Sequence, residues 1–379
     1  MGLDGFLSYI KKKHPEIVKR EHISLYSHST VFFDISSYLY KYICIFGSHD
    51  GRWLTALLQL FLTFRQNKVN IIPIFDGKAP DAKKGENDHR KEQREKIKNK
   101  GDILDECVKK LRNNEPLSEE ETVLFKDTVK TLKEKNGTTK LKSLVNFVNK
   151  MSIEPENKFS EEDISEVEVY IISLRRQMVY IRDTDYTKLK DMLNILGIPF
   201  KTAPNEAETY CCTMLRKGIG KAVISCDSDC FSHGAKDVIL SLETSGIIEH
   251  VELQDILDCL EITASQMTDL AFLFGCDYNT KNKLYKVGPV KAIELIKKFG
   301  SLENIEGYDK DKINNYIELR SLFNIDYPPI KKIANSDIDE DALYNFIEEH
   351  RLRVGRDKVE QTIKIINKKA EIVFAEEEE

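Results

Sequence analysis

Neither a CxxC pair nor a secretory signal occurs in this sequence, although it contains eight cysteines. Cysteines scattered in this way predict a reducing compartment rather than a disulfide-stapled domain. No long hydrophobic run is present either. The longest one near the start, residues 31–46, includes Asp34 and Lys41 and is too short and too polar to cross a bilayer. The opening MGLDGF lacks the Ser or Thr of a myristoylation signal, so we expect a soluble protein without membrane contact.

Excess positive charge is also missing, because the 379 residues carry a net charge of −6. This balance excludes a uniformly basic coat for nucleic acid, but residues 83–100 hold eight Lys or Arg against four Asp or Glu. No His stands beside a Ser or Cys in a triad context, which disfavours nucleophilic catalysis. With 41% hydrophobic residues, the chain can form two average domains or one larger α/β domain with insertions.

Apolar runs alternate with amphipathic stretches, which predicts βαβ units and a mostly parallel sheet flanked by helices. The expected strands are residues 31–35, 71–75, 198–200, 222–225 and 238–240. The expected helices are residues 36–46, 53–65, 187–196, 265–274 and 288–300. Between 78 and 184 the charged, helix-periodic sequence predicts a helical insertion, with a partly disordered linker over 101–165 as the alternative. The remaining residues to about 372 are expected to form helices and loops.

Seven acidic residues stand where apolar segments end or at the start of a helix: Asp34, Asp76, Glu206, Glu208, Asp227, Asp229 and Asp277. Each single one could simply cap the helix or turn that follows it. As a set they need another explanation, because an isolated buried charge costs several kcal/mol and no basic residue lies within the apolar stretches directly before the five Asp. Carboxylates at neighbouring strand ends can share a divalent cation. The sequence therefore predicts a metal site at one edge of the sheet.

Ligands that are all oxygen favour Mg²⁺ or Mn²⁺ over zinc. A zinc alternative exists in Cys226, Cys230 and His233, although their spacing is unusual and no fourth ligand is evident. Several carboxylates around Mg²⁺ indicate phosphoryl chemistry, and two ions roughly 4 Å apart would suit phosphodiester hydrolysis.

Basic residues follow Asp76 at helical spacing. Lys83 and Arg90 are two turns apart and Arg94 lies one turn further, so the three share one helix face. The alternative is an ordinary solvated face, but their nearness to Asp76 favours a clamp on the scissile phosphate.

Six segments together resemble the flap endonuclease/XPG (Rad2-like) family of structure-specific 5′ nucleases. They are VFFDISSYLY, FDGKAPDAKKGENDHR, GIPFKTAPNEAETYCC, CDSDCFSHG, FGCDY and KVGPVKAIELIKKFGS, and the opening MGLDGF is also similar to that family. The similarity spans residues 1–90 and 185–305. It implies a PIN-like fold with residues 1–90 and 185–305 as the nuclease core, 91–184 as an enlarged helical arch, and 306–379 as a helical C-terminal region with an acidic tail.

The resemblance also implies roles for individual residues. Asp34, Asp76, Glu206 and Glu208 would hold mainly one Mg²⁺, and Asp227, Asp229 and Asp277 mainly a second, with Mn²⁺ as a substitute. Lys83 and Arg90 would contact the phosphate at the base of the arch. Tyr40 would stack on an unpaired nucleotide, and Gly2 would approach the site closely. The segment 288–300 would be a helix–two-turn–helix element in which Gly288 and Lys291, together with a K⁺ ion, would hold the duplex backbone.

Three departures from the family limit this transfer. The stretch between Arg90 and Gly197 is longer than in typical flap nucleases, and NTKNKLYKV replaces the short Gly-rich approach to Gly288, which weakens the K⁺ prediction. No sliding-clamp-binding box is visible near the C-terminus, and the tail is acidic. We therefore expect a monomer that acts on branched or flapped DNA in replication, repair or recombination, without clamp recruitment.

Two other functions remain open on the sequence. A 5′→3′ exonuclease, on DNA or on RNA like the Xrn-type enzymes, is one, and a DNA-junction-binding scaffold is the other. The family implies a nuclear location, in the host nucleus if the source is a virus, with the cytoplasm as the alternative.

Overall fold

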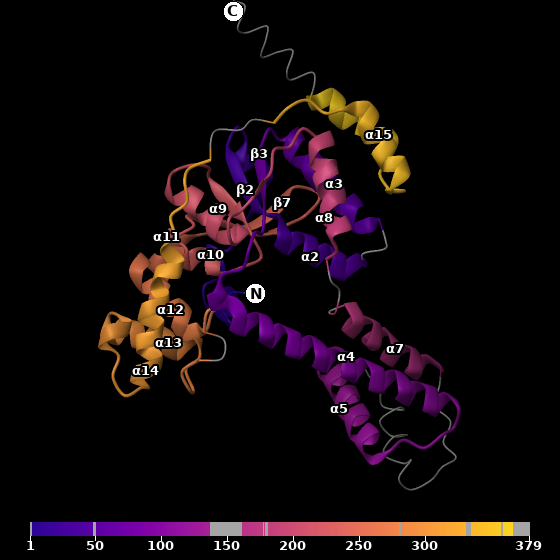
Figure 1. The fold of residues 1–379 in the computed structure, drawn as a ribbon, viewed down its shortest axis with the longest axis vertical. Coiled ribbons are helices and arrows are strands. Elements are labelled where there is room, and N and C mark those ends of the chain that lie inside the picture. Colours follow the sequence, from indigo (N-terminus) through magenta and orange to yellow (C-terminus); the bar gives the residue numbers. More distant parts are fainter. Residues whose placement is uncertain are drawn as a thin grey trace, which may run out of the picture. The chain divides into compact units, whose positions relative to one another are not determined.

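A seven-stranded mixed sheet forms the centre of the larger of two units in the computed structural model (Figure 1). The larger unit is Met1–Asn87 with Ile181–Glu379, and the smaller one is Asp88–Tyr180. The structure describes residues 2–47, 51–136, 161–176, 178, 181–279, 282–330, 335–357 and 359–366. The predicted acidic tail lies outside these residues.

The strands are β1 (Lys19–His22), β2 (Thr30–Asp34), β3 (Asn70–Phe75), β4 (Lys201–Thr202), β5 (Ala222–Ile224), β6 (Asp237–Leu242) and β7 (Ile247–Glu252). Their order in the sheet is β1-β7-β6-β5-β2-β3-β4. The five strands from β6 to β4 run parallel, whereas β7 is antiparallel to both β6 and β1. This arrangement confirms the predicted α/β fold with a mostly parallel sheet.

The α-helices of the larger unit are α1 (Phe6–Lys13), α2 (Ile35–Phe46), α3 (Arg52–Gln66), α8 (Asp183–Ile195), α9 (Ala207–Arg216), α10 (Asp229–Ser232), α11 (Leu253–Leu260), α12 (Ala264–Phe274), α13 (Pro289–Phe299), α14 (Lys310–Leu319) and α15 (Glu340–Glu349). The short 3₁₀ segments given for the described residues are η1 (Pro15–Ile17), η2 (Ile23–Tyr26), η3 (Asp81–Lys83), η5 (Leu302–Asn304) and η6 (Arg320–Asn324). None of the helices that the structure describes combines the length and apolar character needed to cross a membrane.

Most predicted elements occur within a few residues of their expected bounds, but the strand predicted at 198–200 is wrong. After α8 ends at Ile195, the chain is still tied to the helix, because the Ile198 amide donates to the Leu193 carbonyl at 2.9 Å. Gly197 has a φ of 62°, the left-handed conformation with which glycine commonly closes a helix. The strand β4 therefore starts only at Lys201. Edge strand β1 was not predicted, since its sequence KREH carries the charged side chains typical of exposed sheet edges.

Two adjacent aromatic residues of β2 pack against opposite layers of helices, as expected for neighbours along a strand. Phe32 belongs to the large buried cluster that includes Tyr210 of α9. Phe33 contacts Tyr38 of α2 edge-to-face, with ring centroids 4.9 Å apart, and lies 6.2 Å from Phe61 of α3. The sheet is thus covered by α9 on one face and by α2 and α3 on the other.

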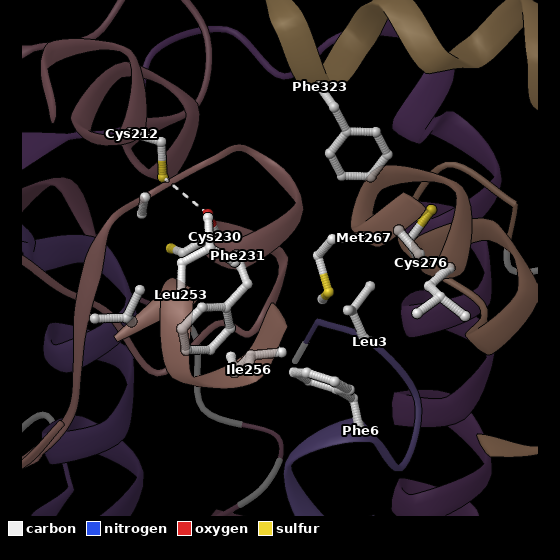
Figure 2. Close-up of a cluster of buried hydrophobic side chains, with 14 of the residues drawn as sticks. Leu3, Phe6, Cys212, Cys230, Phe231, Leu253, Ile256, Met267, Cys276 and Phe323 are labelled. Atoms are coloured by element: carbon white, nitrogen blue, oxygen red, sulfur yellow. Dashed lines mark hydrogen bonds between the residues drawn. The ribbon is translucent and has the colours of Figure 1, made fainter. Parts of the chain in front are cut away.

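A buried aromatic cluster joins α1, α10 and α12. The ring of Phe6 packs edge-to-face on Phe231 at 6.1 Å and on Phe274 at 5.4 Å. Figure 2 shows Phe6 and Phe231 near Met267, within the same cluster. Because α10 and α12 adjoin two of the predicted carboxylate positions, this core holds those positions in place.

The smaller unit consists of helices and has a core of its own. It contains α5 (Glu119–Asn136), α7 (Glu161–Arg176) and most of α4 (Lys84–Arg112). Its buried residues are Leu104, Cys107, Val108, Leu111, Phe125, Leu132, Val167, Ile171 and Leu174. The predicted helical insertion is therefore confirmed over the described residues, and the disordered-linker alternative is wrong for 101–136 and 161–165. Residues 137–160 lie outside the described part.

One buried ionisable cluster lies on the β1 side of the sheet. The His250 Nδ1 is 2.9 Å from an Asp237 carboxylate oxygen, and the Tyr26 hydroxyl donates to the other oxygen at 2.6 Å. Glu21 lies 3.4 Å from His250 Nε2. Burial alone would lower the pKa of His250, but the hydrogen bond and charge of Asp237, together with Glu21, raise it.

We predict that His250 makes stability dependent on pH. A raised pKa means that the charged ring stabilises the fold below about pH 6.5, its ordinary value, and that this contribution is lost as the pH rises through the folded-state pKa. Urea unfolding of the wild type and His250→Gln at pH 6 and pH 8 tests this. The variant should be less stable by about 2 kcal/mol at pH 6, and the difference should shrink at pH 8. An equal difference at both values would contradict the prediction.

Candidate active site

Four of the predicted acidic residues follow three neighbouring parallel strands. Asp34 ends β2, Asp76 follows β3, and Asp227 and Asp229 follow β5. Because β2 lies between β5 and β3 and all three run parallel, their carboxyl ends meet at one edge of the sheet. The strand-end placement predicted for these residues matches the structure.

The two glutamates stand at the start of α9, and only Glu208 lies within the helix. Glu206 is the N-cap of α9, with an extended backbone (φ −89°, ψ 140°), and Glu208 is the second residue of the helix. Asp76 accepts a hydrogen bond from the Ala207 amide at 2.9 Å, so it caps the same helix. Gly77 permits this contact, because a Cβ there would lie 2.1 Å from the Ala203 carbonyl oxygen.

Asp277 follows a helix rather than a strand. It lies in the turn after α12, which a buried Asn279 holds together. The Asn279 Oδ1 accepts from the Cys276 amide at 2.8 Å, and its Nδ2 donates to the Phe272 carbonyl at 2.8 Å. Sequence reasoning missed this role of Asn279, although it stands two residues after Asp277. An Asn two residues after an Asp is a signal that could have revealed the turn.

Lys83 is the central cation of the site. It ends the 3₁₀ segment η3, and its side chain is buried. Its ammonium group contacts Glu206 and lies 2.8 Å from an Asp277 oxygen and 3.3 Å from a Glu208 oxygen. Burial alone would lower the pKa of Lys83, but Glu208, Asp277 and Glu206 raise it well above its usual range. The lysine is therefore charged and neutralises part of the acidic cluster.

Burial and mutual repulsion make the carboxylates hard to ionise together. Burial raises the pKa of Asp34 to about 7, and the charge of Asp76 adds to this effect. Hydrogen bonds from Ser225 Oγ (2.9 Å) and the Ser37 amide (3.4 Å) partly offset the rise. Ser225 is a second residue that the sequence reasoning missed.

The same two causes act on the other buried acids. Burial, with repulsion from neighbouring carboxylates, raises the pKa of Glu208, Asp227 and Asp229, and Glu206 shifts upward despite the opposing effect of Lys83. A site that gathers this much negative charge is stabilised by added cations.

Asp229 shows why the residues fit a divalent cation. Its carboxylate is 1% exposed, and neither oxygen has a hydrogen-bond partner among the described residues. A buried carboxylate without partners is costly unless a cation binds it. Among the residues that the structure describes, no three His, Cys, Asp or Glu side chains are arranged as a metal-binding group. As placed, Glu206, Glu208 and Asp277 surround the Lys83 ammonium, but their donor set of oxygens suits Mg²⁺.

The zinc alternative is not supported in the described part of the chain, where Cys226, Cys230 and His233 form no metal-binding group. His233 is buried, its Nδ1 lies 3.3 Å from the Phe323 carbonyl, and its ring packs on Phe323 at 4.7 Å. Burial lowers the pKa of His233 to about 3, so the ring is neutral and structural.

Gly2 lies against the loop that carries Asp227. A Cβ at Gly2 would lie 2.3 Å from an Asp227 carboxylate oxygen and 2.4 Å from Ser228 Oγ, and the φ of 89° also favours glycine. The Leu3 amide donates to Ser228 Oγ at 2.8 Å, which fastens this segment beside the site.

The predicted nucleic-acid contacts lie on several elements. Tyr40 is half-buried on α2, and Arg90 and Arg94 are on α4 within the smaller unit. Gly288 is the exposed N-cap of α13, and Lys291 is exposed with its ammonium 5.5 Å from the Tyr308 ring centroid. Their roles stay predictions, as does a K⁺ ion near Gly288.

Two family models match this chain. The XPG N-terminal domain matches residues 1–97, and the XPG I-region matches residues 197–277. Together they include all seven acidic residues and Lys83.

Curated relatives align over most of the chain. A probable RAD2-like endonuclease of Invertebrate iridescent virus 6 is 28% identical over 350 residues, which cover 86% of this chain and 79% of that protein. Flap endonuclease 1 of Aedes aegypti is 25% identical over 391 residues, covering 96% and 87%. The solved catalytic core of Rad2 in complex with a DNA substrate has a TM-score of 0.61 at 17% identity and covers 96% of this chain and all of that one. The last similarity shows a shared fold.

We predict that Lys83→Met leaves the acidic cluster without its internal cation. The metal-free variant should be less stable than the wild type by about 3 kcal/mol, because breaking a buried pair exposes uncompensated charge. Added Mg²⁺ should recover more stability in the variant than in the wild type. Thermal unfolding with and without Mg²⁺ measures both effects, and Lys78→Met, at an exposed position of the same loop, is the control. Equal stabilisation by Mg²⁺ in all three proteins would contradict this account of the cluster.

Proposed function

Since this chain belongs to the flap endonuclease/XPG (Rad2-like) family of structure-specific nucleases, we propose that it is a Mg²⁺-dependent 5′ endonuclease. Its substrates would be flapped or branched DNA, in which it hydrolyses phosphodiester bonds. One observation supports the proposal: three carboxylates, from the start of α9 and the turn after α12, contact the Lys83 ammonium, and the acids of three neighbouring parallel strands lie at one edge of the sheet.

Seven carboxylates would hold the metal ions in this proposal: Asp34, Asp76, Glu206, Glu208, Asp227, Asp229 and Asp277. When bound, Mg²⁺ would lower the pKa of the attacking water and stabilise the leaving oxygen. The burial of Asp227 and Asp229 keeps bulk water away from their side of the site. Ser225 and Ser37 orient Asp34, and the Ala207 amide orients Asp76. These contacts fix the ligands before any cation arrives, which limits the ordering cost of binding.

Lys83 would stabilise the negative charge that develops on the scissile phosphate. Its ammonium is already desolvated beside the carboxylates that would hold the metal ions. The sequence predicted that Lys83 shares one helix face with Arg90 and Arg94, which is wrong, because Lys83 ends η3 and α4 begins at Lys84. Arg90 and Arg94, one turn apart on α4, would be further phosphate contacts.

The other proposed DNA contacts rest on the resemblance to the family and on the exposure of Gly288 and Lys291. Gly288 and Lys291 at the start of α13 would hold duplex backbone through the helix N-terminus and a charged side chain. Tyr40 would stack on an unpaired base. Roles in replication, repair or recombination, a monomeric state and a nuclear location are part of the same proposal.

We predict that Asp227→Asn abolishes cleavage while sparing DNA binding. Replacing one buried ligand removes charge that a divalent cation requires, so kcat should fall at least about a thousandfold. Cleavage of a labelled flap in Mg²⁺ and gel-shift binding in Ca²⁺ measure the two quantities. Asp258→Asn, at an exposed position of α11, is the matched control and should cleave normally. Full activity of Asp227→Asn would remove this residue from the site.

We also predict a preference for DNA junctions with a free 5′ strand. A panel of 5′-labelled flap, nick, gap, four-way and single-stranded substrates in DNA and RNA tests this directly with Mg²⁺. Flapped DNA should be cut near the junction, leaving a 5′-phosphate on the downstream product. Rapid stepwise digestion of single-stranded 5′-phosphorylated RNA would instead indicate an exoribonuclease, and tight binding without any cleavage would indicate a scaffold.

A further inference from the structure

We propose that Tyr278 is a positioning residue that holds Glu206 and Lys83 in the geometry needed for cleavage. The proposal rests on the proposed function for its kinetic consequence, but the geometry it describes exists in the protein alone. Tyr278 is neither a predicted ligand nor a predicted nucleic-acid contact, and it follows Asp277 directly in the chain.

Two parts of one side chain act on two different partners. The Tyr278 hydroxyl donates to Glu206 Oε2 at 3.2 Å, and the centroid of its ring lies 5.7 Å from the Lys83 ammonium. Lys83 contacts the other oxygen of Glu206, Oε1. The hydroxyl thus fixes the rotation of the Glu206 carboxylate, so that one oxygen faces the tyrosine and the other faces the lysine.

Lys83 is consequently confined on several sides. Carboxylates of Glu206, Glu208 and Asp277 contact its ammonium, and the aromatic ring of Tyr278 borders it as well. An ammonium within about 6 Å of an aromatic face is attracted to it, more strongly when water is excluded. Without the ring, the lysine would be held by carboxylates alone, and its position would depend on their charge.

Tyr278 is itself firmly placed. It is 7% exposed, and its ring packs edge-to-face on Phe323 with centroids 5.4 Å apart. The neighbouring Asn279 fixes the backbone of the turn through the Cys276 amide and the Phe272 carbonyl.

Glu206, Glu208 and Asp277 would also hold metal ions, whereas Tyr278 is not a proposed ligand, so its ring would still border the Lys83 ammonium when a phosphate enters the site. The benefit is realised in the transition state, because a prepositioned charge needs no reorganisation when negative charge develops. Loss of the tyrosine should therefore lower kcat and leave the KM for DNA nearly unchanged. A residue that served only to stabilise the fold would not separate these two constants.

Two variants separate the hydroxyl from the ring. Tyr278→Phe keeps the ring and should lower kcat about tenfold, as expected for one hydrogen bond to a charged group. Tyr278→Leu removes both and should lower kcat by roughly a further threefold or more. Tyr26→Phe is the matched control, since Tyr26 also donates to a buried-side carboxylate, that of Asp237, on the β1 side of the sheet. Its kcat and KM should equal those of the wild type.

A second measurement needs neither DNA nor metal. The ¹³Cε resonance of Lys83, identified in ¹³C-lysine-labelled protein by its absence in Lys83→Arg, reports the surroundings of the ammonium. It should shift in both Tyr278 variants and stay unchanged in Tyr26→Phe. An unchanged resonance in Tyr278→Phe and Tyr278→Leu, or a kcat of Tyr278→Phe equal to that of the wild type, would overturn the proposal.

The two readouts also separate this proposal from the proposed function. A wild type that cleaves no DNA would reject the nuclease function, whereas the Lys83 resonance would still decide whether Tyr278 positions the lysine. If Tyr278→Leu does not fold, Tyr278→Phe, which retains the ring and its packing on Phe323, decides the question alone.

Discussion

Mutual repulsion among buried carboxylates is the constraint on which this site depends. Asp34, Glu208, Asp227 and Asp229 are nearly inaccessible to water, and burial together with repulsion from neighbouring carboxylates raises the cost of ionising each of them. Lys83 offsets part of that cost from the centre of the cluster. Bound cations can compensate the negative charge that Lys83 leaves. The cluster therefore favours the binding of added cations. The proposed nuclease chemistry would use this negative charge to bind metal ions.

The sheet topology makes the cluster possible. Three adjacent parallel strands deliver their acids to one edge, and helix α9 brings two more from the face that it covers. Between β3 and β4 the chain leaves the sheet and forms the helical unit Asp88–Tyr180 before it returns. The insertion can therefore vary in length without disturbing the strands. Lys83 directly precedes α4, the first helix of the insertion. The site and the insertion are therefore adjacent in sequence at this point.

Local sequence was enough wherever the determining contacts are local. The apolar run before Asp34 predicted a strand and the position of the acid at its end. The relative direction of Glu206 and Glu208 depends on the helix start, because an extended N-cap residue and a helical residue have different side-chain directions. Asp277 was correctly chosen, but the turn that presents it depends on Asn279.

By itself, the sequence determined which residue types could do the chemistry and which segments would be buried, because period, capping and composition are properties of short windows. Only the tertiary structure decided which of them meet. Lys83 reaches Glu206 across 123 positions of chain, a contact set by parallel strand pairing and by the close approach at Gly77. The proposed role of Tyr278 likewise depends on tertiary contacts, of its hydroxyl with Glu206 and of its ring with Lys83. Contacts so distant in sequence follow from the packing of whole layers, which no local pattern encodes.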